Sequence, residues 1–151
     1  MQLETLLQEI VRKAVILKDS ETDAQGAPVN YACIFCHSPE EYESFCTSIK
    51  TLGKLLEETA TGPLFHIKPM QTVAGMLQLV KIRKPDAARP EQGDADFTIS
   101  DYLTFKNENL SRAGFSLIQR PKFEMIELMK EGTDVLVYFS HPPLVQQYGL
   151  V

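Results

Sequence analysis

Two stretches of the chain share one arrangement of elements, and this internal repeat constrains the fold more than any other feature. The first unit spans about residues 30–85 and the second about 94–144. Tyr42 in the first unit has its counterpart at Tyr102, 60 residues later. A repeat of this length usually marks a supersecondary unit that buries its apolar face only by packing with a second copy. We therefore predict a single domain, 30–151, that contains both units.

Each unit shows a strand pattern, a helix pattern and three further strand patterns. In the first unit, an apolar run at 30–36 precedes Ser38, which suits the start of a helix, and Gly53 suits its end. The second unit has the same order, with a helix expected from Asp101 to Gly114. Further strands are predicted at 54–58, 64–68, 75–82, 96–100, 115–119, 123–129 and 134–139. The predicted fold class is α+β, with tandem βαβββ units forming a curved, incompletely closed sheet.

Residues 1–29 precede the repeat and are predicted to form an amphipathic helix and a linker. Apolar residues recur at helical spacing from Leu3 to Val15, with charged residues between them. Turn-forming residues dominate 19–28, which indicates the linker. The helix pattern includes Glu4 and Glu9, which a secretory signal peptide would not carry, so we expect a cytoplasmic protein.

Charge and hydropathy exclude two classes of partner. The 151-residue chain has a formal net charge of -5, whereas phosphate backbones require clustered lysine and arginine. No segment approaches the roughly 18 consecutive apolar residues of a membrane helix. We expect neither nucleic acid nor membrane as a partner, and a homodimer remains an open alternative.

Strand alternation predicts which side chains share a face of the sheet. Phe97 and Ile99 should pack against the helices, which turns the side chain of Asp96 to the opposite face. The same argument places Phe123 and Met125 on the helix side and Glu124 on the opposite face. The face away from the helices is therefore predicted to carry Tyr31, His66, Lys81, Asp96, Thr98, Glu124 and Tyr138. So many polar groups indicate either a solvated surface or a groove for a small molecule.

Two short motifs match known functional patterns, but both favour ordinary structure. The segment from Cys33 to His37 matches the C-x-x-C-H pattern of covalent haem attachment. Cys33 and Cys36 would point to opposite faces of a strand, however, so a buried strand is favoured and no cofactor is expected. The sequence GDAD around Asp94 and Asp96 suggests cation binding, but a turn that enters a strand explains it as well.

The tandem βαβββ pattern over about 30–144 resembles the vicinal oxygen chelate superfamily, which includes glyoxalase, bleomycin-resistance and extradiol dioxygenase proteins. Three segments resemble more narrowly the bacterial YecM-like branch: CHSPEEYESFCTSIKTLGKLLEE, LFHIKP followed by LQLVKIRKP, and FSHPPL. The resemblance implies an open barrel-like sheet whose metal ligands, typically His, Glu, His and Glu, come from the first and last strands of both units.

The positions that the resemblance assigns to the metal are Tyr31, Lys81, Asp96 and Tyr138. A protonated lysine cannot ligate a metal, and a phenol with a pKa near 10 is a poor ligand at neutral pH. We therefore expect no tightly bound transition metal, and a small-molecule-binding protein of glyoxalase-like fold whose usual ligand positions are replaced.

Two alternatives remain open at this stage. One is an enzyme of lyase, isomerase or dioxygenase type, either with relocated ligands such as His66, Asp96 and Glu124 or metal-free with Lys81 and a tyrosine. The other is a protein-interaction module. We also hypothesise that Lys81 and Asp96 form a salt bridge that replaces the metal.

Overall fold

The computed structural model describes residues 1–150 and contains two βαβββ units preceded by a long helix. The helix and the first unit comprise α1 (Leu3–Glu21), β1 (Val29–Phe35), α2 (Pro39–Ile49), β2 (Gly53–Thr59), β3 (Gly62–Thr72) and β4 (Gly75–Arg83). The second unit comprises β5 (Gly93–Phe97), α3 (Tyr102–Asn109), β6 (Phe115–Gln119), β7 (Glu124–Leu128) and β8 (Val135–His141). A short helix, α4 (Leu144–Gln147), follows.

All eight strands form one mixed, open sheet in the order β2-β3-β4-β1-β5-β8-β7-β6. Within each unit the first strand pairs in parallel with the last, β1 with β4 and β5 with β8. The two units meet where β1 and β5 pair antiparallel at the centre of the sheet. The predicted α+β class and the open sheet of βαβββ units are confirmed, and the first strands of both units lie side by side.

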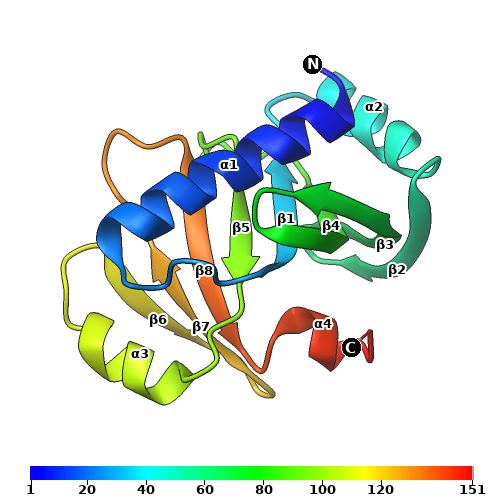
Figure 1. Cartoon of the computed structure of the whole chain (residues 1–151). Coiled ribbons are helices and arrows are strands. Elements are labelled where there is room, and N and C mark those ends of the chain that lie inside the picture. Colours follow the sequence, from blue (N-terminus) through cyan, green and yellow to red (C-terminus); the bar gives the residue numbers. More distant parts are fainter. Residues whose placement is uncertain (151) are drawn as a thin grey trace.

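Helices α1, α2 and α3 cover one face of the sheet and bury the main core. In Figure 1, α1 crosses the sheet in front of β1, β5 and β8, while α2 and α3 lie towards opposite ends. Phe45 of α2 and Phe105 of α3 are both buried in this core. The predicted amphipathic helix is thus confirmed, and its apolar side joins the core shared by both units.

The first helix is longer than predicted, because Asp19–Glu21 continue α1 instead of forming a linker. Lys18 lies inside the protein and is only 1% exposed. Its ammonium donates to Asp19 Oδ1 at 2.6 Å and to the Ala24 carbonyl at 2.7 Å, and it lies 5.2 Å from the Phe97 ring centroid. These contacts hold the following turn against the helix end.

The start of α2 follows the prediction, whereas its end does not. Ser38 caps the helix by accepting a hydrogen bond from the Glu41 amide. The helix ends at Ile49, and Gly53 instead begins β2 without a positive φ. A Cβ atom at Gly53 would lie 2.2 Å from the His66 carbonyl oxygen, so close backbone pairing requires glycine there.

Two strand predictions need correction in the second unit. The first strand starts at Gly93, three residues earlier than predicted, which adds Asp94 to the sheet. In β7 the predicted faces are reversed: Ile126 and Leu128 join the helix-side core, while Met125 packs on the opposite face. The segment FEMIELM has apolar residues in both alternating positions, so alternation alone could not choose between the two faces.

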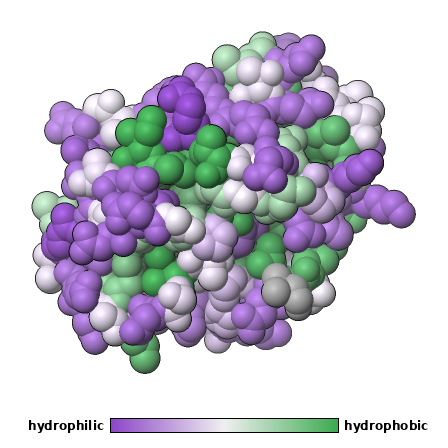
Figure 2. Space-filling model, viewed as in Figure 1, coloured by the Kyte–Doolittle hydropathy of each residue, from purple (hydrophilic) through white to green (hydrophobic). Residues whose placement is uncertain are grey.

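The surface seen from the α1 side is mainly polar, with apolar side chains gathered in small separate patches (Figure 2). Within residues 1–150, no helix is long and apolar enough to cross a membrane.

Candidate functional site

The face of the sheet opposite α1, α2 and α3 carries a groove of about 290 Å3. Both units contribute to it, and α4 lies beside it. This volume lies just below the usual range for small-molecule sites, which starts at about 300 Å3. The groove is lined by Tyr31, Thr59, Thr61, Leu64, Lys81, Arg83, Arg89, Asp94, Asp96, Ile118, Arg120, Phe123, Met125, Tyr138, Leu144 and Tyr148.

Strand pairing places the central polar residues of the groove in two neighbouring rows. One row runs from Tyr31 on β1 through Asp96 on β5 to Tyr138 on β8. In the next row, Cys33 of β1 pairs with Lys81 on one side and with Asp94 on the other. Successive rows on one face are two residues apart, which is about 7 Å along a strand.

Asp94 and Asp96, here called the acid pair, form the floor of the groove. Asp96 is completely buried and Asp94 is 6% exposed. Asp96 Oδ1 accepts a hydrogen bond from the Ser140 amide at 2.9 Å, but Asp96 Oδ2 and Asp94 Oδ1 are buried without a hydrogen-bond partner among residues 1–150. Buried polar atoms without partners are rare in proteins and usually mark a site for a ligand, an ion or water.

Burial changes the protonation of the acid pair. It raises the pKa of Asp96 to about 6, although hydrogen bonds from Ser140 act in the opposite direction. Burial, reinforced by the neighbouring Asp96, raises the pKa of Asp94 well above its usual value. Two carboxylates on adjacent same-face positions repel each other, so the pair will hold a proton at a pH where exposed carboxyls are ionised.

Two tyrosines flank Asp96, and both are neutral phenols. Burial raises the pKa of Tyr31 well above 10. It also raises the pKa of Tyr138, whose hydroxyl donates to Glu127 Oε2 at 2.6 Å. Glu127 is itself buried, so this hydrogen bond fixes the Tyr138 ring at the groove wall.

Four cationic side chains line the same groove, from Lys81, Arg83, Arg89 and Arg120. The proposed Lys81–Asp96 salt bridge is absent from the ion pairs within residues 1–150, which corrects that hypothesis. The reason is register, because Lys81 lies in the Asp94 row and not in the Asp96 row. Burial lowers the pKa of Lys81, and the nearby Arg83 acts in the same direction.

The short helix α4 was not predicted, yet it contributes two groove residues, Leu144 and Tyr148. Its Val145 is buried against Leu64 and Leu79 of the first unit. The Tyr148 hydroxyl donates to Glu57 Oε2 on β2. The chain after β8 therefore crosses back to the first unit and closes one side of the groove.

Four of the six predicted site residues line the groove together: Tyr31, Lys81, Asp96 and Tyr138. His66 does not line it; His66 pairs in register with Leu79, and its Nε2 lies 3.4 Å from Gln78 Oε1. Glu124 points to the helix side, where it accepts hydrogen bonds from Tyr102 and Lys106, both at 2.8 Å. The suggested metal trio of His66, Asp96 and Glu124 is therefore not brought together.

Several groove residues were missed from the sequence, above all Asp94 and the arginines. The segment from Asp94 to Phe97 alternates polar and apolar residues, so a strand beginning at Gly93 would have placed both acids on one face. Arg89 lies in the irregular connector between the units, where no periodicity predicts orientation. The opposite faces predicted for Cys33 and Cys36 are confirmed, since they belong to different core clusters.

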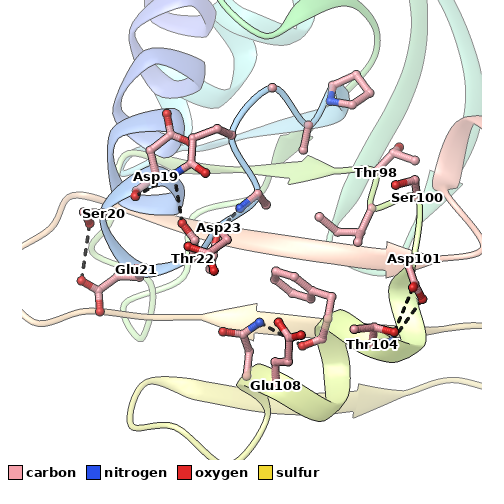
Figure 3. A pocket seen from close by; sticks show the side chains of 18 of the residues that line it. Asp19, Ser20, Glu21, Thr22, Asp23, Thr98, Ser100, Asp101, Thr104 and Glu108 are labelled. Carbon is pink, nitrogen blue, oxygen red and sulfur yellow. Dashed lines mark hydrogen bonds between the residues drawn. The ribbon is translucent and has the colours of Figure 1, made fainter.

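A larger cavity of about 750 Å3 lies between the C-terminal end of α1 and α3 (Figure 3). It is open and lined by several acids, including Asp19, Asp23 and Asp101. Some of its polar groups already have partners, because Thr104 donates to Asp101 Oδ2 at 2.9 Å and Ser20 donates to Glu21. The carboxylates of this larger cavity lie at the surface, where water can hydrate them. The smaller groove, with its buried carboxyl groups, is therefore the stronger candidate for a ligand site.

The residues of the groove do not fit the metal that the sequence resemblance implies. Of the four implied positions, Tyr31 and Tyr138 carry neutral phenols and Lys81 carries an amine, which leaves Asp96 as the single carboxylate. Within residues 1–150, no group of three or more histidine, cysteine, aspartate or glutamate side chains is arranged to hold a metal ion.

No protein-family model matches the sequence, and neither does any curated protein. Among solved structures, the chain is similar to one described as "Structural Genomics, Protein EC4020", with 17% identity and a TM-score of 0.60 over 91% of this chain and 80% of that one. This likeness concerns the fold alone. A glyoxalase/bleomycin resistance protein/dioxygenase superfamily member from Vibrio splendidus 12B01 gives a TM-score of 0.46 at 8% identity, over 76% and 97% of the two chains, which is too weak to support an argument.

Proposed function

We propose that the protein binds a small organic molecule in the groove between its two units, and that its fold is glyoxalase-like with the usual metal positions replaced. One observation carries the proposal: Asp94 and Asp96 line the groove, and their buried oxygens Asp94 Oδ1 and Asp96 Oδ2 have no hydrogen-bond partner within residues 1–150. Leaving such groups unpaired costs stability, and a protein maintains them where a ligand supplies the missing donors.

The composition of the groove walls supports a small molecule over a macromolecule. Aromatic and aliphatic side chains such as Tyr138, Phe123 and Met125 alternate with a few charged groups. This combination of apolar walls with convergent polar groups is typical of small-molecule sites.

Binding can be tested with a library of small acids, amines and zwitterions, observed by saturation-transfer NMR on the full chain. We expect hits that are lost in Ile118→Trp, because Ile118 lines the groove and a larger ring there would fill it. Val73→Trp is the matched control, since Val73 is 67% exposed and lies outside the groove. An empty screen, or hits that Ile118→Trp retains in full, would count against the proposal.

The proposal also includes function without a tightly bound transition metal. Elemental analysis of untagged protein should give well under one ion per chain, because the groove offers neutral phenols and an amine at three of the four implied positions. Stoichiometric zinc, manganese, nickel or iron that disappears in Asp96→Ala would refute this part of the proposal.

A further inference from the structure

The groove keeps opposite charges apart, and this separation indicates what kind of ligand it binds. Within residues 1–150, neither Lys81 nor any arginine forms an ion pair with Asp94 or Asp96. Lys81 and Asp94 flank Cys33 on the two neighbouring strands, so their backbones are separated by about 10 Å, two strand spacings. Lys81 and Asp94 still favour each other's charged form across this distance, but no direct ion pair within residues 1–150 joins them.

The charges also follow an order along the strands. Arg83 pairs with Phe35, Lys81 with Cys33, and the next residue on that face of β1 is Tyr31, which pairs with Asp96. Lys81 and Arg83 of β4 therefore lie beside the C-terminal end of β1. In the acid pair, Asp94 lies in the same row as Lys81, and Asp96 lies in the same row as Tyr31. The second unit adds apolar walls to the groove, where Met125 and Ile118 pack in one cluster with Tyr138.

The acid pair has unused acceptors and the cations have unused donors. The buried carboxyl oxygen Asp94 Oδ1 receives no hydrogen bond within residues 1–150, and Asp96 Oδ2 likewise has no partner there. Arg83 Nη2 donates to Asp86 at 3.2 Å, while its Nε is buried without a partner. A ligand that satisfies this groove must bring donors to the acids and acceptors to the cations at the same time.

We propose that the groove binds an apolar α-amino acid as its zwitterion, with the ammonium at Asp94 and Asp96, the carboxylate towards Lys81 and Arg83, and the side chain between Tyr138 and Met125. This inference rests on the proposed function, because it names the ligand class of the same groove. The two charged ends of the ligand would form charge-assisted hydrogen bonds with groups that have no partner within the chain. A ligand with one charge would leave the other set of groups unpaired.

Calorimetric titration of the full-length protein with three related probes tests the class directly. L-phenylalanine has both charges, 3-phenylpropionate lacks the ammonium, and 2-phenylethylamine lacks the carboxylate. We expect L-phenylalanine to bind at least about tenfold more tightly than either analogue, as the loss of a charged hydrogen bond predicts. This comparison uses the unaltered protein, so it does not depend on how well any variant folds.

Variants then assign each charge to its partner. Asp96→Asn and Asp94→Asn should weaken L-phenylalanine about tenfold or more and leave 3-phenylpropionate unaffected or tighter, because a negative neighbour has been removed. Lys81→Met should weaken L-phenylalanine and 3-phenylpropionate but not 2-phenylethylamine. Glu40→Gln and Lys50→Met, at exposed positions outside the groove, are the matched controls and should change nothing.

The possible results distinguish failure of the amino-acid ligand class from failure of the proposed small-molecule binding. Equal binding of L-phenylalanine and 3-phenylpropionate would overturn the inference while leaving a small-molecule groove. No binding of any of the three probes, together with library hits that Ile118→Trp abolishes, would also overturn the class alone. No binding of probes or library compounds would overturn both the inference and the proposed function.

Discussion

At the scale of single residues, the acid pair is the unusual feature of the protein. Ionisation of a completely buried carboxyl group is unfavourable because the charged form loses its hydration. Asp96 is such a group, and the Ser140 amide donates a single backbone hydrogen bond to it. The surrounding Tyr31 and Tyr138 are neutral, and the Asp94 carboxyl adds repulsion. Ionisation of Asp96 therefore destabilises the folded protein in the absence of a ligand.

This cost should appear as a pH-dependent stability. The folded-state pKa of Asp96, about 6, lies above its usual value of 3.8. Well below pH 3.8 the group is protonated in both states, and its contribution to stability is lost as the pH rises through 6. A difference of about two pKa units corresponds to about 3 kcal/mol, so Asp96→Asn should gain about that much relative to the parent between pH 4 and pH 7.

Urea unfolding of both proteins at the two pH values measures this gain. Glu40→Gln provides the control, because Glu40 is exposed and does not line the groove. If the stability difference between Asp96→Asn and the parent were the same at pH 4 and pH 7, burial of the Asp96 carboxyl would carry no pH-dependent cost.

Sequence alternation placed some of these residues correctly and missed others for identifiable reasons. Asp96 and Tyr138 were predicted on the groove face because their neighbours along each strand are apolar, and Tyr31 was placed there by comparison with the second unit. Glu124 was misplaced because its strand is apolar on both sides. The position of Lys81 relative to Asp96 depends on the register between strands, which a single sequence does not encode locally.

At the scale of elements, glycines set how closely the strands approach. The sequence marked Gly53 as special but suggested the wrong cause, since a helix end and a close backbone contact both favour glycine. In the structure its Cβ position would lie 2.5 Å from the Ile67 Cα on the paired strand. We expect Gly53→Ala to destabilise the protein by about 3 kcal/mol, because the obstructing atoms belong to the backbone and cannot move aside.

Gly26→Ala is the comparison that isolates this effect. Gly26 has a φ of 79°, but nothing lies within 4 Å of its Cβ position. Its substitution should cost only about 1 kcal/mol, the penalty for a left-handed backbone with a side chain. Thermal or urea unfolding ranks the two variants, and a larger cost for Gly26→Ala would show that backbone conformation outweighs close contact at these two glycines.

At the scale of the whole molecule, α1 and the β1–β5 pair join the two units into one body. The buried residues of α1 belong to the same core cluster as Phe45 of the first unit and Phe105 of the second. The sequence predicted this helix but assigned it to a separate N-terminal segment, because amphipathicity shows that a helix packs without showing against what. The architecture of the units was predictable from the repeat, whereas the shared core required the assembled sheet.

Because the two units share one core, a substitution that destabilises one unit should also destabilise the other. Phe45→Ala should lower the free energy of unfolding by about 3–5 kcal/mol, as expected for a buried phenylalanine. Hydrogen exchange followed by mass spectrometry reports on each unit separately, through peptides from β1 and β8. We expect the slowest-exchanging amides in both strands to lose protection by the same amount. Phe105→Ala, in the second unit, should have the same effect on both strands.

If Phe45→Ala reduced protection in β1 alone while β8 kept the parent value, the units would open independently. The groove between them would then rest on two loosely coupled halves, and its fixed spacing of charges would lose its structural basis.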